Sequence, residues 1–267
     1  MAVEAIYEHP DHYDLEVASR EVKDLEFWRT LLLRERPVRV LEVGSGTGRL
    51  TLPLARLGSK HGFSMTGLEL EPTMIQRARA HAAREQDQLG DVLQYIEGDI
   101  RLSQLPESYD AILLPYGVGH HLVDLDDQLT AWRNIRRHLA PGGLLAIDLE
   151  APDFSTLSRA LTGTGPRPDL DIQGSDGQRI RRSAASHYEQ ATQLATHAFY
   201  YNVTSGDDSR DQYASEFAMH VYFPREVELL CRATGFTVER MLGSYAGEPF
   251  GDHSRVMIAL ARATTLA

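Results

Sequence analysis

Three glycines, Gly44, Gly46 and Gly48, follow an apolar run and precede a helix-like segment. Glu42 stands two positions before the first glycine, and Glu69 lies at the end of the next apolar run. Glycine permits positive φ values and a close approach of a ligand to the backbone. Amides at a helix N-terminus can receive an anionic group, and a carboxylate after the second strand can accept both hydroxyls of a ribose. The pattern favours a nucleoside ligand, although three glycines alone could simply turn a strand into a helix.

Two common phosphate-binding motifs do not fit this loop. The dinucleotide fingerprint G-x-G-x-x-G needs a third glycine where this chain has Arg49, which counts against NAD and FAD. A P-loop would need a Gly-Lys-Ser/Thr sequence, and none follows.

The elements that must position these residues alternate regularly as far as Glu150. Short apolar strands are predicted over residues 38–43, 63–70, 92–99, 109–115 and 144–150. Helices are predicted between them over residues 49–58, 71–86 and 124–140, and one amphipathic helix over residues 14–36 precedes them. Such alternation implies parallel strands joined by right-handed crossovers.

The pattern changes after Glu150. Residues 162–178 are rich in glycine and proline and predict a loop, and three strand-like runs follow at 180–188, 193–204 and 213–223. A helix over 224–236 and strands over 237–245 and 255–262 resume the first pattern. The predicted fold is therefore α/β, a Rossmann-like doubly wound sheet of seven mostly parallel strands with an antiparallel β insert after the fifth strand. The expected division is a core over 1–150, an insert over 151–223 and the completion of the core over 224–267.

Composition excludes several classes of protein. The chain has 267 residues, 42% of them hydrophobic and 24% charged, as is ordinary for a globular protein. A net charge of -11 disfavours a nucleic-acid partner or a polyanionic membrane, and no apolar run is long enough to cross a bilayer. The one cysteine, Cys231, allows no disulfide within the chain and indicates a cytoplasmic protein; we expect it in the core.

Five segments together resemble a known family. "VLEVGSGTGRLTLPLA", "GLELEPTMIQRAR", "IEGDI", "YDAILLPYGVGHHL" and "LAPGGLLAID" occur in the order and spacing of the class I S-adenosylmethionine-dependent methyltransferases. The resemblance covers roughly residues 38–150 and implies S-adenosyl-L-methionine (SAM) as the cofactor and S-adenosyl-L-homocysteine (SAH) as its product.

The resemblance also implies positions for the cofactor. The methionine part would lie along Glu42, Gly44, Ser45, Gly46 and Gly48; Glu69 would hold the ribose, Leu70 would pack on the adenine, and Asp99 with Ile100 would bracket the base. Tyr13, or less well Tyr7, would reach the cofactor carboxylate. Asp99 could instead serve a turn or a helix cap, and Glu71 is expected to cap the helix that follows it.

The acceptor is expected beside the carboxyl ends of the strands. Pro115, Tyr116, His120 and His121 follow the fourth strand and would therefore lie near the reacting methyl group. Either histidine could be a general base, a metal ligand or a structural residue, but no regularly spaced set of carboxylates and histidines supports a metal. Tyr116 completes the candidate catalytic group.

The β insert is rich in aromatic residues and histidine, which suits a lid over an organic acceptor. His187, Tyr201 and His220 are candidate acceptor contacts, and His253 or Arg255 could add to the rim. The alternative is a β-sheet surface that forms a homodimer.

The leading hypothesis is a cytoplasmic methyltransferase acting on a small molecule, a metabolite or natural product, at nitrogen, oxygen or carbon. A protein or RNA methyltransferase is the second hypothesis. A non-catalytic SAM-binding partner subunit is the third.

Overall fold

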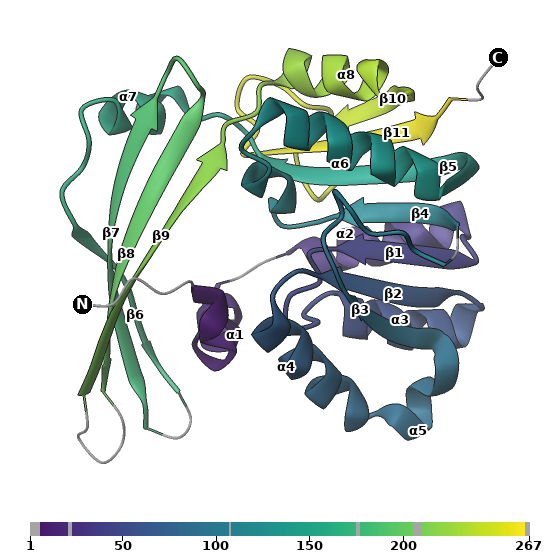
Figure 1. Ribbon diagram of the computed structural model, residues 1–267, viewed down its shortest axis with the longest axis horizontal. Helices are drawn as coiled ribbons and strands as arrows, with labels where there is room; N and C mark the ends of the chain where they lie inside the picture. Colours follow the sequence, from purple (N-terminus) through teal and green to yellow (C-terminus); the bar gives the residue numbers. More distant parts are fainter. Residues whose placement is uncertain (1–5, 21–22, 107, 175–176, 205–209, 265–267) are drawn as a thin grey trace. The chain divides into compact units, whose positions relative to one another are not determined.

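The computed structural model describes residues 6–20, 23–106, 108–174, 177–204 and 210–264 (Figure 1). The chain forms two compact units. The sheet unit contains the described residues of 23–151 and 222–267, and the insert unit contains those of 1–22 and 152–221. The N-terminal segment thus groups with the β insert, whereas the sequence pattern placed it with the core.

The sheet unit contains the seven strands of the predicted fold. Its elements are α2 (Asp24–Glu35), β1 (Arg39–Val43), α3 (Thr51–His61), β2 (Ser64–Glu69), α4 (Pro72–Ala83), α5 (Gln86–Leu89), η2 (Gly90–Val92), β3 (Leu93–Glu97), β4 (Tyr109–Leu114), η3 (Val118–His121), α6 (Leu125–His138), β5 (Leu139–Glu150), α8 (Pro224–Ala233), β10 (Phe236–Leu242) and β11 (Val256–Ala263). The strand order is β10-β11-β5-β4-β1-β2-β3. Strands β1 to β5 pair in parallel, and β11 is antiparallel to both β5 and β10. The predicted Rossmann-like fold is confirmed.

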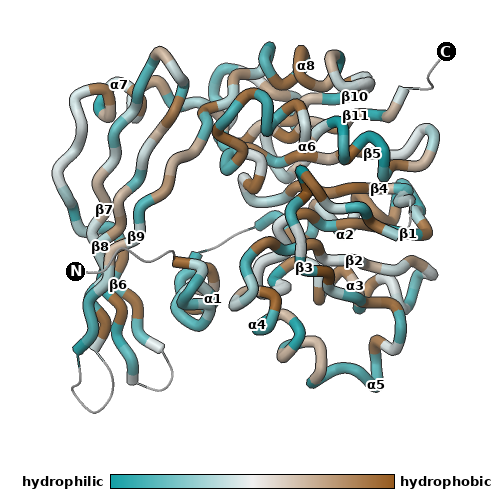
Figure 2. Tube along the Cα trace, in the orientation of Figure 1, coloured by the Kyte–Doolittle hydropathy of each residue, from teal (hydrophilic) through white to brown (hydrophobic). Residues whose placement is uncertain are grey.

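Helices cover both faces of this sheet, which explains why its central strands, such as β1 and β4, are largely buried and apolar. In β4, Ile112 and Leu114 belong to one buried cluster and Ala111 and Leu113 to the other. Figure 2 shows β4 hydrophobic along most of its length. No helix in the described part of the chain is long and apolar enough to cross a membrane.

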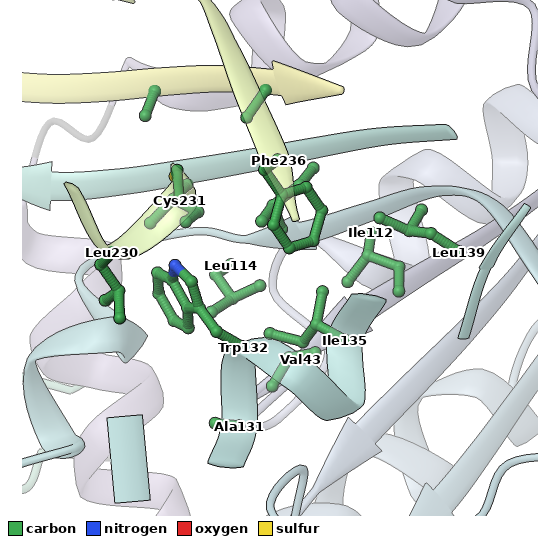
Figure 3. Packing of buried hydrophobic residues seen from close by; sticks show 14 of the residues in the cluster. Val43, Ile112, Leu114, Ala131, Trp132, Ile135, Leu139, Leu230, Cys231 and Phe236 are labelled. Atoms are coloured by element: carbon green, nitrogen blue, oxygen red, sulfur yellow. The ribbon is translucent and has the colours of Figure 1, made fainter. Parts of the chain in front are cut away.

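One cluster packs α6 and α8 against the sheet, and the other packs α2 and α3 against the opposite face. Figure 3 shows the first cluster, in which Trp132 and Ile135 of α6 lie near Cys231 of α8 and Phe236 of β10. Cys231 is fully buried, so the prediction that it is a core residue is confirmed.

The insert unit contains η1 (Ile6–Glu8), α1 (Pro10–Ser19), α7 (Phe154–Ala160) and the strands β6 (Arg167–Gln173), β7 (Arg179–Glu189), β8 (Leu194–Thr204) and β9 (Arg210–His220). These strands pair antiparallel in chain order. Three strands were expected, and the fourth, β6, lies where the sequence predicted a loop. Its proline and its charged residues concealed it, and such residues are tolerated because β6 is an edge strand. Asp171 of β6 pairs with Arg179 of β7 at 2.7 Å.

The single helix predicted over 14–36 is wrong, because two helices occupy this region. Helix α1 ends at Ser19, Arg20 is extended, and α2 begins at Asp24. The two helices pack in different units: α1 holds Glu16 against Arg182 of β7, whereas α2 buries Trp28 against the seven-stranded sheet.

Candidate active site

The glycine loop joins β1 to α3, and the space around its three glycines differs from one to the next. All three have positive φ values, +68° at Gly44, +56° at Gly46 and +87° at Gly48. A Cβ atom on Gly44 would lie 2.5 Å from Val118, and one on Gly48 would lie 2.4 Å from the Tyr95 hydroxyl. A Cβ on Gly46 would meet only Met74, at 3.6 Å. Packing therefore requires Gly44 and Gly48, whereas Gly46 leaves room for a ligand.

The loop amides are already paired within the protein. Gly44 N and Ser45 N both donate to the carbonyl of Leu68 in β2, at 2.8 and 3.1 Å, and Gly48 N donates to Ser45 O at 3.0 Å. The expectation that these amides receive an anionic group is therefore not met. The buried Ser45 Oγ, by contrast, has no hydrogen-bond partner among the described residues.

Glu69 ends β2 with its carboxylate turned toward the glycine loop. Its Oε2 accepts Gly46 N at 2.7 Å and its Oε1 accepts Glu71 N at 2.9 Å. Burial raises the pKa of this carboxyl, and the backbone donors oppose that rise. Each carboxylate oxygen has a second acceptor site, so both could receive ribose hydroxyls. Glu71 is at the N-cap of α4, as expected, but its side chain makes no capping hydrogen bond.

Glu42 lies beneath the loop and is almost completely buried. Thr51, the first residue of α3, donates its hydroxyl to Glu42 Oε2 at 2.7 Å. Burial raises the pKa of Glu42 to about 8, with further repulsion from Asp24 and Glu69. Glu42 is therefore largely protonated at neutral pH and supports the start of α3.

The three residues expected around the adenine have different surroundings. Leu70 is 53% exposed and can offer an apolar surface to a base. The Asp99 carboxylate instead pairs with Arg101, at 2.6 Å from Nη2, and Arg101 also binds Asp127. Ile100 is buried in the core cluster beneath α6. The competing interpretation of Asp99 as a turn residue therefore has direct support, since Asp99 Oδ1 also accepts Arg101 N.

Pro115 and Tyr116 follow β4, and Pro115 is buried. Tyr116 has a φ of +56°, a strained value for a residue with a side chain. The Arg49 guanidinium lies 4.9 Å from the centre of its ring. Arg49 also forms two hydrogen bonds, of 2.8 and 2.7 Å, with the fully buried Asp24 at the start of α2. In the sequence, Arg49 was noted only because it stands where the dinucleotide fingerprint has its third glycine. Nothing in the sequence indicated that Asp24 is its partner.

Asp148, near the end of β5, is a further buried acid that sequence reasoning missed. Its Oδ2 accepts the Tyr245 hydroxyl at 2.6 Å and Tyr116 N at 3.2 Å. Desolvation raises the pKa of Asp148 to about 6, although these two donors lower it. One signal was available, since an aspartate inside an apolar run such as "LLAIDLE" needs a partner.

The two histidines of η3 differ in their surroundings. His120 is buried, packs against Tyr222 and accepts Glu150 N on its Nε2 at 3.0 Å. This bond uses the nitrogen that a general base would need and gives His120 a structural role. His121 is exposed by its residue surface. Partial desolvation and the neighbouring His120 lower the pKa of its imidazole, which favours the neutral form of the ring.

The remaining candidates belong to other elements of the fold. Tyr7 and Tyr13 pack in a cluster of the insert unit with the buried Tyr201. In the same unit His187 is exposed and His220 is buried. Their contacts with cofactor or acceptor, and those of the exposed His253 and Arg255 before β11, stay predictions. In the described part of the chain no group of three or more histidine, cysteine or acidic side chains could hold a metal.

Comparison with known proteins identifies the family. Residues 40–143 match the model of a methyltransferase domain. The chain is 24% identical over 227 residues to a cypemycin N-terminal methyltransferase of Streptomyces, covering 83% of this chain and 81% of that protein. It is 30% identical over 183 residues to the ubiquinone/menaquinone biosynthesis C-methyltransferase UbiE of Teredinibacter turnerae, covering 63% and 71%. The chain belongs to the SAM-dependent methyltransferases.

The fold of this methyltransferase agrees with that assignment. A SAM-dependent methyltransferase from Clostridium acetobutylicum superposes with a TM-score of 0.77 at 17% identity, over 97% of this chain and 100% of the other. The resemblance stated from sequence, SAM as the cofactor and the enzymatic character are all confirmed.

The residues at the glycine loop fit SAM. Gly46 leaves an open approach, Ser45 has an unused buried hydroxyl, and Glu69 presents a fixed carboxylate. SAM carries a sulfonium and an ammonium against one carboxylate, so it is cationic overall. Negative charge is available to this cation at the loop, because Asp24 and Glu69 lie close enough to Glu42 to raise the pKa of its carboxyl by repulsion.

Proposed function

We propose that this methyltransferase transfers the methyl group of SAM to a small molecule at the carboxyl edge of the seven-stranded sheet. One observation carries the proposal: Glu69 at the end of β2 and the open side of Gly46 after β1 lie at the same carboxyl edge of the sheet as Pro115–Tyr116 after β4 and Asp148 near the end of β5. The first pair suits the nucleoside, and the second group lies where an acceptor would meet the methyl group.

The chain's own residues would act mainly by positioning. Bound SAM supplies an electrophilic methyl group. Glu69 would hold the ribose hydroxyls, and Leu70 would cover the adenine. Asp148 and Arg49 hold Tyr116 from two sides, one through its backbone amide and the other through its ring. Holding both reactants in line contributes about 7–11 kcal/mol in favourable cases.

The acceptor class is part of the proposal. One relative named above is an N-terminal methyltransferase and another a C-methyltransferase, so they do not decide the atom that is methylated. A small molecule is favoured over RNA because the net charge is -11. We likewise propose a cytoplasmic enzyme, with the β insert as its lid or as the surface of a homodimer.

Ligand binding tests the proposal directly. SAH at 100 times its dissociation constant should stabilise the protein by about 2.7 kcal/mol, seen as a rise in melting temperature. NADH at the same concentration should have no effect. Stabilisation by NADH with none by millimolar SAH would refute the proposed function.

A further inference from the structure

Asp148 has one oxygen that the protein uses twice and one that it does not use. Oδ2 accepts both the Tyr245 hydroxyl and Tyr116 N. No hydrogen bond to Oδ1 is found among the described residues. The residue is only 2% exposed, but Oδ1 is not one of the buried side-chain atoms that lack a partner, so it keeps some access from outside. An oxygen of a largely buried carboxylate that can be reached from outside, and that no protein group occupies, is available to a ligand that can donate a hydrogen bond to it.

The position of Asp148 favours the acceptor over the cofactor. Its neighbours along β5, Leu144 and Ala146, belong to the cluster under α2 and α3, and Asp148 continues that face. In the strand order β5-β4-β1-β2, β4 lies between Asp148 and the glycine loop that follows β1. Both β4 and β1 lie between Asp148 and Glu69 of β2. Strands are spaced by about 4.8 Å, so β5 lies roughly 10 Å from β1. The carboxylate contacts the backbone of Tyr116, beside which the methyl group is expected.

The charges facing Asp148 favour a cation at its open oxygen. Arg49 lowers the pKa of Asp148, but Asp24 raises it and already engages Arg49 through two hydrogen bonds. Tyr245 and Tyr116 contribute neutral donors only, and the pKa of Tyr245 is itself raised by burial and by Asp148. The neighbourhood therefore retains an excess of negative charge that Arg49 does not neutralise.

We propose that Asp148 binds the protonated nitrogen of an amine acceptor through Oδ1 and removes its proton, which makes this enzyme an N-methyltransferase. This inference rests on the proposed function. The proton moves from the ammonium to Oδ1, which leaves a nitrogen lone pair. A new N–C bond then forms as the C–S bond breaks, with its electron pair remaining on sulfur. The product is a methylated ammonium, and Asp148 later releases its proton to water.

Tyr245 is the positioning residue in this scheme. Its hydroxyl fixes Oδ2 and so aims Oδ1. It also stabilises the ionised form of Asp148, because the hydrogen bond lowers the pKa of the carboxyl. An aspartate with a pKa of about 6 is mostly ionised at neutral pH yet can take up a proton.

The test uses matched pairs of amines and alcohols: benzylamine with benzyl alcohol, cyclohexylamine with cyclohexanol, and glucosamine with glucose. Methyl transfer from labelled SAM and the melting temperature of the SAH complex are measured for each pair at pH 8. We compare the wild type with Asp148→Asn, which preserves shape, and with Asp126→Asn, which removes an exposed acid of the same unit.

We expect amines, and not their alcohols, to be methylated or to stabilise the SAH complex. Asp148→Asn should lower the rate of amine methylation at least about 100-fold, as expected for loss of a base, and should leave the affinity for SAH unchanged. Asp126→Asn should behave like the wild type. Tyr245→Phe should retain activity but move the acid limb of kcat/KM upward by about one pH unit.

Three results would overturn the inference. One is methylation of the alcohols in preference to the amines. Another is that the wild type and Asp148→Asn methylate the amines equally, or not at all, and show the same melting temperatures with them. The third is weaker binding of SAH, but not of 5′-methylthioadenosine, to Asp148→Asn, which would assign the carboxylate to the cofactor's own ammonium. Failure of the wild type to bind SAH would instead refute the proposed function.

Discussion

The two halves of the carboxyl edge use buried acids in opposite ways. On the β1–β2 half, both oxygens of Glu69 are held by backbone amides of nearby segments. On the β4–β5 half, Asp148 accepts both of its hydrogen bonds on one oxygen, Oδ2, and its other oxygen stays open. A fixed acid suits a nucleoside that is bound in one orientation, whereas a half-satisfied acid suits a group that arrives with a positive charge and leaves a proton.

The largest expected effect comes from Arg49, which follows the glycine loop, pairs with Asp24 of α2 and lies over the ring of Tyr116 after β4. Arg49→Ala would leave the fully buried Asp24 without its partner, which should cost about 3–5 kcal/mol of unfolding free energy. Arg56→Ala, which breaks an exposed pair with Glu85, should cost at most about 1 kcal/mol. Urea unfolding measures both, and equal losses would show that the Asp24–Arg49 pair is not a buried ion pair in solution.

The comparison itself predicts unequal effects of the variants on cofactor affinity. Glu69→Gln should weaken SAH binding by about 10-fold to 100-fold, because charged hydrogen bonds to the ribose are lost. Glu71→Gln and Asp148→Asn should stay within about threefold of the wild type, a difference worth less than 1 kcal/mol. Isothermal titration calorimetry gives these constants. A loss at Glu71 as large as that at Glu69 would mean that the ribose ligand is wrongly assigned.

The protonation of Glu42 predicts a dependence of stability on pH. Its pKa is about 8 in the folded protein and near 4.5 when unfolded, so its contribution is complete below pH 4.5 and is lost as pH rises through 8. The unfolding free energy should therefore fall across this window relative to Glu42→Gln, by up to about 1.4 kcal/mol per pH unit. Parallel curves for the two proteins would contradict a protonated Glu42.

The smallest effect is expected at Asp99. Its carboxylate is engaged by a partly exposed Arg101, so Asp99→Asn should change stability by no more than about 1 kcal/mol. SAH affinity should also change less than in Glu69→Gln. If the two variants lose SAH affinity equally, Asp99 contacts the adenine despite its ion pair.

The same comparison explains what the sequence could predict. The partners of Glu69 lie 23 and 2 residues away, within one strand–loop–helix unit that a local pattern reveals. The partners of Asp148 lie 32 and 97 residues away, and nothing in the local sequence indicates that Tyr245 reaches it. Strand alternation predicted the central sheet because burial on both faces leaves continuous apolar runs.

Other elements escaped prediction for equally physical reasons. The helix over 14–36 has one continuous periodicity, but its two parts bury their apolar faces in different units. Strand β6 lies at a sheet edge, where charged side chains and proline are tolerated, and so it read as a loop. His120 was a candidate base until the structure showed that its Nε2 accepts a backbone amide of β5.

A crystal structure of the SAH complex tests the central claim most directly. The account predicts ribose hydroxyls within hydrogen-bond distance of both Glu69 oxygens, the sulfur atom beside Pro115 and Tyr116, and Asp148 Oδ1 open on the acceptor side of the sulfur. SAH bound away from Glu69, or with its ribose held by Glu71 instead, would contradict it.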